Sequence, residues 1–583
     1  MKKLLLFIFA IVLIALTACT QVKLTELRIT GTSNHTVFVG QSVNLFESVN
    51  VISNTGDAYL NELTITSEDC QITDNIITSD VVYVCNITYY IEVKDVSDEK
   101  NITVSFVEEN ENIELIEEYN NLRIYQIYVS AYQDGILGGY DVGYGPSNHN
   151  GDLQGIINAL DYIENLGVNA IWLTPIFESK ENINHSEYEI RGRSTGYFAD
   201  DYYNIDPNFG TNELFRTLVD EVHERGMYIL LDGVFGHHGS YPIDGVVDGR
   251  SQWYGHETVY PESLDFFIDV ATYWIEEYEI DGWRMDQAYQ LYQDDYNYFR
   301  DIRSAVEQLC LERKENGETW GILGYMVAEV WDNPENIQKY GYNQTAFRSA
   351  FDFPTQYMLI QALTNQGNIT AILQELDVTL NYDYSDFAQP NLFISNHDMI
   401  RLADLFQISG LEYQSFERHK LAFSFLAAYT GPITIYYGDE YADDFSGLTY
   451  GVYELDSYPY IAQDNVGRTN GKISGFTANQ EVLINYVRDL MTMRDTYDSL
   501  WNGDRENVYI NNNIYADLKT SENNQILYIF NISEQNQEIT ISSESFNGSQ
   551  IRNLFTGEII PITGNQVTIN TTSLEAMYFL IEN

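Results

Sequence analysis

The chain has 583 residues, of which 44% are hydrophobic and 14% aromatic, so it exceeds one ordinary domain and can bury several cores. Its 30 Lys and Arg stand against 86 Asp and Glu, which gives a net charge of −56. Such a field repels nucleic acid and anionic lipid, and we therefore expect no nucleic-acid partner. The acidity has two open explanations, adaptation to a salty medium or a soluble surface of biased composition.

The N-terminus has the pattern of a secretory signal. A basic start, Met1–Lys3, precedes the apolar run Leu4–Leu16 and the small-residue site L-T-A-C, which ends at Cys19. This arrangement resembles the bacterial lipoprotein signal, which implies removal of residues 1–18 and a lipid on Cys19. We expect a protein anchored by that lipid at the extracellular face of the cell membrane. An ordinary cleaved signal followed by secretion is the alternative.

Residues 19–118 are predicted to form a β-sandwich of immunoglobulin-like type. Runs rich in β-branched and aromatic residues alternate there with turn residues: Val37–Val39, Val81–Val84, Ile87–Val93 and Ile102–Val107. Cys70 and Cys85 could form a disulfide outside the cell, but the spacing leaves the pairing open. This domain is either a spacer from the membrane or a carbohydrate-binding module.

From Arg123 the pattern changes to strands alternating with amphipathic helices, such as the stripe of apolar residues between Leu264 and Tyr278. The predicted strands are Arg123–Val129, Ala170–Ile176, Met227–Val234, the stretch Ile280–Ala288, Gly324–Val330, Phe347–Phe353, Asn391–Ser395 and Ile433–Tyr437. This alternation predicts a (β/α)8 barrel, a TIM barrel, over residues 119–501. Helical periodicity then stops, and short strand patterns predict a C-terminal antiparallel β domain over residues 502–583.

Three acids follow predicted strand ends. Asp286 ends the fourth strand, Glu329 ends the fifth and Asp398 follows the seventh. Active sites of such barrels lie at the C-terminal ends of the strands, so the three acids are expected to face one mouth. Arg284 lies two residues before Asp286 and points the same way, which suits either an ionised, nucleophilic carboxylate or a structural ion pair. The placement of all three acids at strand ends disfavours the structural interpretation of the pair.

Four motifs in order resemble those of the α-amylase family of retaining glycoside hydrolases. They are D-G-V-F-G-H at Asp232–His237, G-W-R-M-D at Gly282–Asp286, E-V-W at Glu329–Trp331 and N-H-D at Asn396–Asp398. Gly196-Tyr197 and Y-Y-G-D-E at Tyr436–Glu440 give further support, and the resemblance spans roughly Arg123 to Glu440.

The resemblance implies a role for each motif residue. Asp286 would be the nucleophile, Glu329 the acid and base, and Asp398 an acceptor for sugar hydroxyls. The implied substrate-binding residues are Arg284, His237, His397, Tyr197, Asp232 and Trp331. Arg284 would orient Asp286, His237 and His397 would donate to hydroxyls, and Tyr197 would offer its ring to the sugar. Trp331 would either line the cleft or pack beneath Glu329.

The chain also departs from the family pattern. Gly236 stands where an asparagine commonly binds calcium, Thr195 replaces a frequent histidine, and Tyr289-Gln290 replace the Lys–His of many α-amylases. We therefore expect the usual calcium site to be absent and the leaving-group side of the cleft to be altered. Only residues 239–261 are available where the family usually carries an inserted domain, which predicts a long loop and a low wall.

No cofactor is expected to be required. Asn148, Asn150 and Asp152 place oxygens at alternating positions and could form a different structural Ca2+ site, although Asn-rich turns alone explain the same pattern. We assign no metal to the reaction.

Together these features predict a monomeric retaining hydrolase of α-1,4-glucosidic bonds in starch, glycogen or maltodextrins, acting through a covalent glycosyl-enzyme. The alternative is an exo-acting α-glucosidase or an α-glucan transglycosylase, because water and a sugar hydroxyl can attack the same intermediate. A non-catalytic glucan-binding surface protein is disfavoured because all three acids are present.

Overall fold

The computed structural model describes residues 23–583 except 31, 33–34, 41, 47–48, 56–58, 68, 82, 108–114, 136–137, 143–145, 181–189, 191, 253, 294–295, 344–345 and 446–465. The predicted signal and Cys19 lie outside the described residues and stay predictions. Within the described part of the chain, no helix is both long and apolar enough to cross a bilayer. The chain divides into two compact units, residues 1–111 with 381–384, and residues 112–380 with 385–583.

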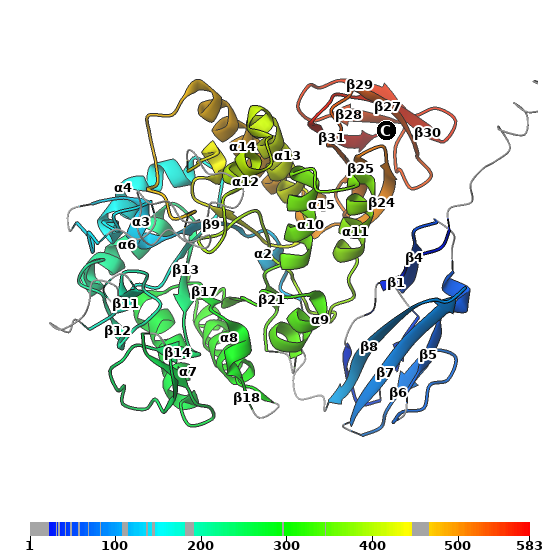
Figure 1. Cartoon of the computed structure of the whole chain (residues 1–583). Helices are drawn as coiled ribbons and strands as arrows, with labels where there is room; N and C mark the ends of the chain where they lie inside the picture. Colours follow the sequence, from blue (N-terminus) through cyan, green and yellow to red (C-terminus); the bar gives the residue numbers. More distant parts are fainter. Residues whose placement is uncertain are drawn as a thin grey trace, which may run out of the picture. The chain divides into compact units, whose positions relative to one another are not determined.

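The first unit is a small β-sandwich, drawn in blue in Figure 1, as the sequence predicted. Its strands are β1 Leu27–Thr30, β2 His35–Phe38, β3 Ser42–Asn44, β4 Asn50–Ser53, β5 Thr64–Thr66, β6 Ile76–Thr78, β7 Tyr83–Val93 and β8 Val96–Val107. The runs predicted as separate strands around Val84 and Ile91 form the single strand β7. Asn86 does not interrupt it because this side chain points outward, between buried Cys85 and Ile87.

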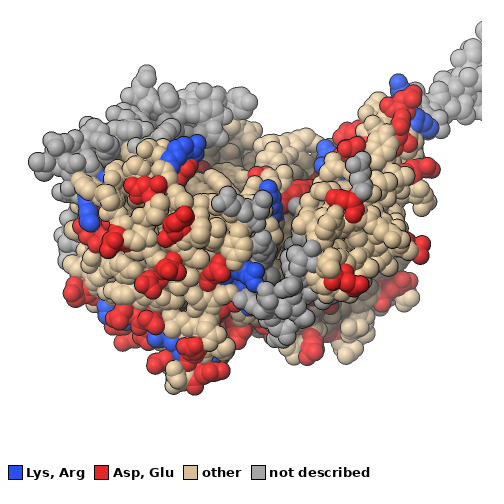
Figure 2. Space-filling model, turned by 90° about the horizontal axis from the view of Figure 1, so that it is seen from below, with Lys and Arg blue, Asp and Glu red and all other residues tan. Residues whose placement is uncertain are grey.

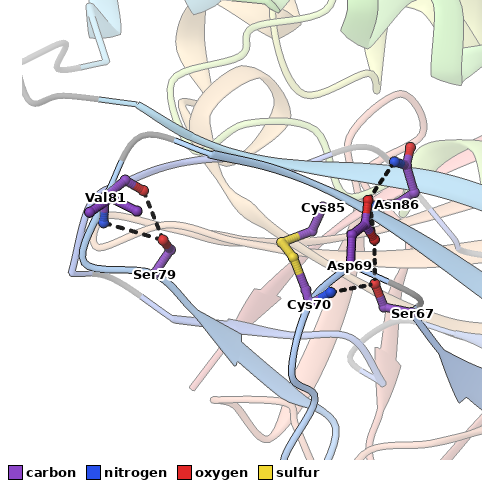
Figure 3. The surroundings of a disulfide bond; sticks show 7 residues. All are labelled: Ser67, Asp69, Cys70, Ser79, Val81, Cys85 and Asn86. Carbon is purple, nitrogen blue, oxygen red and sulfur yellow. Dashed lines mark hydrogen bonds between the residues drawn. A yellow bond between two sulfur atoms is a disulfide. The ribbon is translucent and has the colours of Figure 1, made fainter.

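Cys70 and Cys85 form a disulfide, so the pairing that the sequence left open is present (Figure 3). The backbone N–H of Cys70 donates to Ser67 Oγ at 3.1 Å. Asn86 Nδ2, next to Cys85, donates to Asp69 Oδ2 at 2.8 Å. The loop is therefore tied to β7 by a covalent bond and by side-chain hydrogen bonds. Its 15-residue separation corresponds to about 3 kcal/mol of stabilisation from the restricted unfolded chain.

The second unit contains a closed barrel of parallel strands. The strands are β9 Arg123–Ile127, β10 Ala170–Leu173, β13 Tyr228–Gly233, β17 Gly282–Met285, β20 Tyr325–Ala328, β21 Ser349–Ala350, β22 Leu392–Phe393 and β23 Ile433–Tyr436. They form one 8-stranded sheet in the order β21-β20-β17-β13-β10-β9-β23-β22. A parallel bridge between Phe351 and Asn391 joins the two outer strands. The predicted TIM barrel is thus confirmed, with all eight strands inside or at the predicted stretches.

Helices connect successive strands and surround the barrel (Figure 1). The main helices are α4 Leu153–Glu164, α6 Asn212–Glu224, α7 Leu264–Tyr278, α8 Phe299–Glu315, α10 Phe353–Leu363, α11 Ile369–Leu380, α12 Leu402–Ile408, α13 Ser415–Ala427 and α14 Ala478–Thr496. Helix α7 has the bounds of its predicted apolar stripe and buries Phe267, Trp274 and Ile275 against the barrel. It leads directly into β17 and thus places Asp286 at the barrel mouth.

Residues 239–261 form more than the predicted loop. Strands β14 His237–His238, β15 Asp248–Ser251 and β16 His256–Thr258 make a small sheet in the order β14-β16-β15. The segment after β13 therefore turns back on itself, and β16 pairs with β14 at His237. This small sheet forms the wall of the mouth at the position of the predicted loop.

The C-terminal domain is antiparallel, as predicted. Strands β24 Asp504–Asn511, β25 Ile514–Thr520, β26 Gln525–Asn531, β28 Gln550–Asn553, β29 Ile559–Pro561 and β31 Glu575–Glu582 form one sheet, while β27 Gln537–Ser542 pairs with β30 Gln566–Thr571. The domain packs on α13, where Tyr578 Oη donates to the Ser424 carbonyl, and on the segment that follows, where Lys519 Nζ donates to Thr430 Oγ1 at 2.6 Å. All these residues belong to the same compact unit.

On the face of the molecule shown in Figure 2, acidic side chains are scattered among uncharged residues and are more frequent than basic ones. This distribution agrees with the net charge of −56. A surface of this kind favours neutral ligands over anionic ones.

Candidate active site

The three predicted acids lie at the C-terminal ends of barrel strands. Asp286 directly follows β17, Glu329 directly follows β20, and Asp398 lies in the turn after β22. Asp286 and Glu329 are only 4% and 6% exposed, whereas the Asp398 side chain is 31% exposed. The strand pattern therefore predicted their positions correctly.

One guanidinium connects three of the carboxylates in the mouth. Arg284 Nη1 lies 2.7 Å from Asp232 Oδ1 and 3.0 Å from Asp286 Oδ1. Its Nη2 lies 2.8 Å from Glu329 Oε1. Because the guanidinium is planar and its donors are fixed, it sets the relative orientation of Asp286 and Glu329. Arg284 itself is buried and cannot reach a substrate without displacing these acids.

Asp232 was expected to bind substrate, but it has no exposed surface. Besides Arg284, it accepts hydrogen bonds at Oδ2 from Tyr197 Oη at 3.0 Å and from Trp172 Nε1 at 3.3 Å. This geometry corrects the expectation: Asp232 orients Arg284 and Tyr197 and presents no oxygen to the mouth.

The side chains of Arg468 and His397 contact the carboxylate of Asp398. Arg468 Nη2 lies 2.7 Å from Asp398 Oδ1, and His397 Nε2 lies 3.2 Å from Asp398 Oδ2. His397 also has its Nε2 2.7 Å from Tyr197 Oη and its Nδ1 2.7 Å from Gln126 Nε2. Both ring nitrogens of His397 therefore have protein partners, and its predicted donation to a sugar hydroxyl requires one of these contacts to be exchanged.

Tyr197 lies where a sugar ring could meet it. Its ring is stacked on His397, with centroids 5.4 Å apart and an angle of 14° between the planes. The side chain is partly exposed, unlike that of His397. His237 is buried, and its Nδ1 lies 3.1 Å from Gln290 Oε1. Tyr197 and His397 therefore lie beside the acids, whereas His237 contacts Gln290; the predicted contacts of all three with a sugar stay predictions.

Burial dominates the proton affinities of the acids. It raises the pKa of Glu329 to about 7 and that of Asp286 to about 7, in both cases against the lowering effect of Arg284. Arg284 favours the ionised form of Asp286, but burial and the neighbouring charges of Asp232 and Asp398 oppose it and raise the pKa. At Asp398, burial raises the pKa, but His397, Arg468 and Arg284 outweigh it and hold the pKa below its ordinary range.

The family model for the alpha amylase catalytic domain matches residues 126–246 and 252–447. The chain belongs to the alpha-amylase family. It is therefore a glycoside hydrolase of the α-amylase type, and the resemblance found in the motifs is confirmed.

Family members of several kinds are similar to this chain. A cyclomaltodextrinase of Geobacillus thermopakistaniensis (strain MAS1) is 29% identical over 454 residues, which are 70% of this chain and 66% of that protein. An intracellular maltogenic amylase of Bacillus subtilis (strain 168) is 33% identical over 323 residues, 50% of this chain and 48% of its own length. The chain thus spans about half to two thirds of these curated relatives.

A solved structure of the family covers more of the chain. The crystal structure of AmyP in complex with maltose is 38% identical, covers 80% of this chain and 97% of that chain, and has a TM-score of 0.73. An Anoxybacillus alpha-amylase is 25% identical, with the same 80% coverage and a TM-score of 0.63. These likenesses agree with the barrel and C-terminal domain described above.

Two departures from the α-amylase motifs are spatially linked. A Cβ atom on Gly236 would lie 2.0 Å from Gln290 Oε1 and 2.5 Å from Gln290 Cβ. Gln290 therefore fills the space that a side chain at position 236 would need, and it reaches His237 from there. Its Nε2 donates to Gln287 Oε1 at 3.0 Å. In this member of the alpha-amylase family, an uncharged amide network connects the first and second motifs.

That network also reaches Glu329. Gln287 has a φ of 41°, a left-handed conformation that is unusual for a residue with a side chain. In this conformation its N–H donates to Glu329 Oε2 at 3.1 Å. Tyr289, which is 45% exposed, donates from Oη to Gln287 Oε1 at 2.6 Å. The residues that replace Lys–His therefore support the backbone that holds Glu329.

A cavity of about 920 Å³ adjoins this network. It is lined by Gly236 and Gln290, by Arg250 and Glu257 of the small sheet, and by Gln252 between two of its strands. Trp331, two residues after Glu329, is 53% exposed and stacks on Phe353 at 17° between the planes. The ring of Trp331 is therefore too exposed to be buried beneath Glu329, and its place in the cleft stays a prediction.

The predicted calcium ligands have other partners. Asp152 caps helix α4 by accepting from the Gly155 N–H at 2.8 Å, and Asn150 Nδ2 donates to Asp134 Oδ2 at 3.0 Å. Asn148 is exposed. In the described ranges, no group of at least three His, Cys, Asp or Glu side chains is arranged to hold a metal. This donor set fits calcium poorly, and the site stays a prediction.

Sequence reasoning missed three residues that support the acids. Gln126 and Trp172 lie inside barrel strands, where their neighbours are core residues; a glutamine within R-I-Y-Q-I-Y-V was the available signal. Arg468 follows no regular element, and no local pattern links it to Asp398.

Proposed function

We propose that this chain is a retaining α-glucan hydrolase that cleaves α-1,4-glucosidic bonds by double displacement. The observation that carries the proposal is the shared guanidinium: Arg284 lies 3.0 Å from Asp286 Oδ1 and 2.8 Å from Glu329 Oε1. Retaining enzymes need two carboxyl groups close together, one to attack the anomeric carbon and one to protonate the departing oxygen. The names of the relatives, cyclomaltodextrinase and maltogenic amylase, support an α-glucan as substrate.

In the proposed reaction, Asp286 attacks the anomeric carbon while Glu329 gives its proton to the glycosidic oxygen. The bond to the leaving sugar breaks, and a glycosyl-Asp286 ester forms. Glu329, now a carboxylate, then takes a proton from water, which attacks the same carbon and releases Asp286. The raised pKa of Glu329, about 7 through burial, suits a group that must hold a proton near neutral pH.

Asp398 and Tyr197 are proposed to bind the sugar during this reaction. The lowered pKa of Asp398, which its cationic neighbours cause against burial, keeps that carboxylate charged. A charged acceptor holds the sugar hydroxyls more strongly as positive charge develops on the ring. Tyr197 would meet the C–H face of the same sugar, with His397 supporting its ring from behind.

Transglycosylation is the second candidate, and the cavity of about 920 Å³ favours it. Gln287, which lines this cavity, donates to Glu329, so the cavity lies on the side of the acid and of the leaving sugar. An acceptor sugar bound there could attack the glycosyl-enzyme in place of water.

A timed analysis of products from maltoheptaose tests the proposal. Hydrolysis with retention predicts shorter maltooligosaccharides whose new reducing ends are initially α-anomers by proton NMR. Products longer than the substrate would establish transfer, and glucose alone from the start would establish exo cleavage. Asp286→Asn and Glu329→Gln should each lose most activity. If both variants matched the parent, these acids would not be catalytic.

We also propose the lipid anchor on Cys19 and a monomeric mature form. The supporting feature is the L-T-A-C pattern after Leu4–Leu16. Intact mass of membrane-extracted protein should show a diacylglyceryl group on Cys19 and no residues 1–18, whereas an unmodified soluble form would contradict the anchor. Light scattering of the detergent-free, unlipidated protein tests the monomer.

A further inference from the structure

A second cavity lies away from the barrel mouth, between the outer helices and the C-terminal domain. It measures about 390 Å³, within the range of small-ligand sites. It is lined by Glu417 and Lys420 of α13, Tyr486 of α14, Phe555 after β28, Leu574 before β31 and Glu575 at the start of β31. None of these residues follows a barrel strand, so the cavity is separate from the acids described above. Figure 1 shows α13 and α14 beside the C-terminal strands.

An aromatic surface forms one side of this cavity. Phe555 is 40% exposed, and its ring stacks on Tyr486 with centroids 5.5 Å apart and 19° between the planes. Asn553 Oδ1 accepts from the N–H groups of Phe555 and Thr556, both at 2.9 Å, which fixes the turn. The ring is thus exposed but held in place, so a ligand can stack on it at a small cost in conformational entropy.

The opposite turn is strained. Leu574 has a φ of 52°, which is unusual for a residue with a large side chain. The turn keeps this conformation because Leu574 N–H donates to the Ser533 carbonyl at 3.0 Å and Ser573 N–H donates to Asn536 Oδ1 at 2.9 Å. Backbone strain that is maintained by surrounding contacts is concentrated at ligand sites. The turn is therefore held in one conformation opposite the aromatic pair.

The polar groups define the kind of ligand. Two carboxylates, Glu417 and Glu575, and one ammonium, Lys420, surround the aromatic pair, together with the hydroxyls of Thr556 and Ser573. The excess of carboxylates disfavours an anionic ligand. Several acceptors and donors beside an exposed ring suit a neutral polyhydroxylated ring, with apolar C–H groups on its face and hydroxyls at its edge.

We propose that this cavity is a second binding site for α-glucan, which holds a polymer chain while another part of it is cleaved at Asp286. The choice of glucan rests on the proposed function. The site itself adds affinity for long chains only, because a short oligosaccharide gains nothing from a second contact on the same molecule, whereas a polymer engages both sites at high effective concentration.

Affinity electrophoresis of the full chain in native gels with and without amylopectin tests the site. All proteins carry Glu329→Gln so that the polymer is not cleaved during the run. Phe555→Ala should weaken the apparent affinity for amylopectin roughly three- to tenfold. The matched control is Tyr357→Ala on α10, which removes a ring that is 60% exposed and lies elsewhere; it should stay within twofold. Phe555→Tyr, which keeps an aromatic face, should retain binding.

A second variant covers the case in which Phe555→Ala fails to fold. Glu417→Ala changes an exposed side chain on α13 and leaves the ring intact; it should weaken the same affinity roughly threefold or more. In the active background, both variants should keep kcat/KM on maltotriose within twofold. Unchanged mobility of folded Phe555→Ala and Glu417→Ala in amylopectin would overturn the site.

The two proposals fail in different ways. If the parent protein cleaves maltoheptaose but no variant changes its retardation, the second site is wrong and the proposed function stands. If the parent releases no products from any α-glucan yet is retarded by amylopectin through Phe555, the proposed function is wrong and the binding site stands.

Discussion

Arg468 donates from Nη2 to Asp398 Oδ1 at 2.7 Å, although 70 residues separate the two in the chain. Its Nε also donates to the His397 carbonyl at 2.9 Å. One side chain thus fixes both the carboxylate of Asp398 and the backbone before it. Without this cation, one of the groups that lower the pKa of Asp398 against burial would be lost, and the turn would lose its anchor.

We therefore expect Arg468→Gln to lower kcat/KM on maltoheptaose by roughly tenfold to a hundredfold. The reason is that the Asp398 carboxylate would hold the sugar hydroxyls less firmly, and this contact contributes most in the transition state. Arg468→Lys keeps the charge but cannot donate to both Asp398 and the His397 carbonyl in the same way, so its kcat/KM should lie between those of the parent and Arg468→Gln. Melting temperatures identify any loss that comes from unfolding. Parent-like kinetics in folded Arg468→Gln would show that this contact does not serve the reaction.

The pH dependence of kcat/KM should be bell-shaped around about 7. Burial raises the pKa values of both Asp286 and Glu329 to about 7, and the active form has one proton on the pair. Activity is then lost at low pH when Asp286 is protonated, and at high pH when Glu329 is deprotonated. Initial rates from pH 4 to 10 measure both sides of the profile.

An activated substrate distinguishes the contribution of Glu329 to the pH profile from that of Asp286. With α-maltosyl fluoride, the leaving group needs no proton, so Glu329→Gln should retain measurable formation of the glycosyl-enzyme and lose the alkaline decline. If the alkaline decline persisted in this variant, a group other than Glu329 would be responsible for it.

Glu329→Gln should also stabilise the protein at alkaline pH. The pKa of Glu329 is raised in the folded chain from 4.5 to about 7, so the folded state binds its proton more tightly than the unfolded state does. The free energy of unfolding therefore falls as the pH rises through this window, and the loss is complete above it.

Because glutamine does not ionise, the variant avoids this loss. We expect it to exceed the parent by about 1 to 3 kcal/mol at pH 8 and to match it near pH 4. Urea unfolding followed by circular dichroism at both pH values measures the difference. A variant that is less stable than the parent at pH 8 would contradict the predicted cost of the buried charge.

Gly236 and Gln290 should be energetically coupled. Gly236→Ala places a methyl group against Gln290, which must leave His237 and Gln287, and we expect a loss of about 1 to 3 kcal/mol in stability. Combined with Gln290→Gly, the same methyl group has space. The two changes should then be non-additive by about 1 kcal/mol or more in a double-mutant cycle. Additive effects would mean that the two positions do not compete for the same volume.

Much of the fold follows from local patterns. Helix α7 has its predicted bounds because one continuous apolar stripe must be buried, and the acids at strand ends share a mouth because parallel strands all point one way. The sequence pattern predicts two strands where the structure has the single strand β7, because Asn86 is a polar residue typical of turns. In the structure Asn86 lies on the outward face of the strand.

The parts of the site that were not predicted depend on tertiary contacts. Gln126 lies in the sequence among strand residues, and only barrel closure brings it to His397. Asp232 matched a motif, but its burial beneath Arg284 and Tyr197 could not be read from spacing. The fit of Gln290 beside Gly236 likewise requires two motifs that are distant in the chain to lie face to face.

The contacts between helix α13 and the C-terminal domain have a consequence for unfolding. Tyr578 and Lys519, which lie in strands of the C-terminal sheet, donate hydrogen bonds to residues of the barrel domain, and both side chains are buried. Separating the two parts would break these hydrogen bonds and expose the apolar surface around them, so neither part gains by unfolding alone. Calorimetry should therefore register barrel and C-terminal domain as a single heat-absorption peak, and a chain ended after Asn502 should be recovered as aggregate.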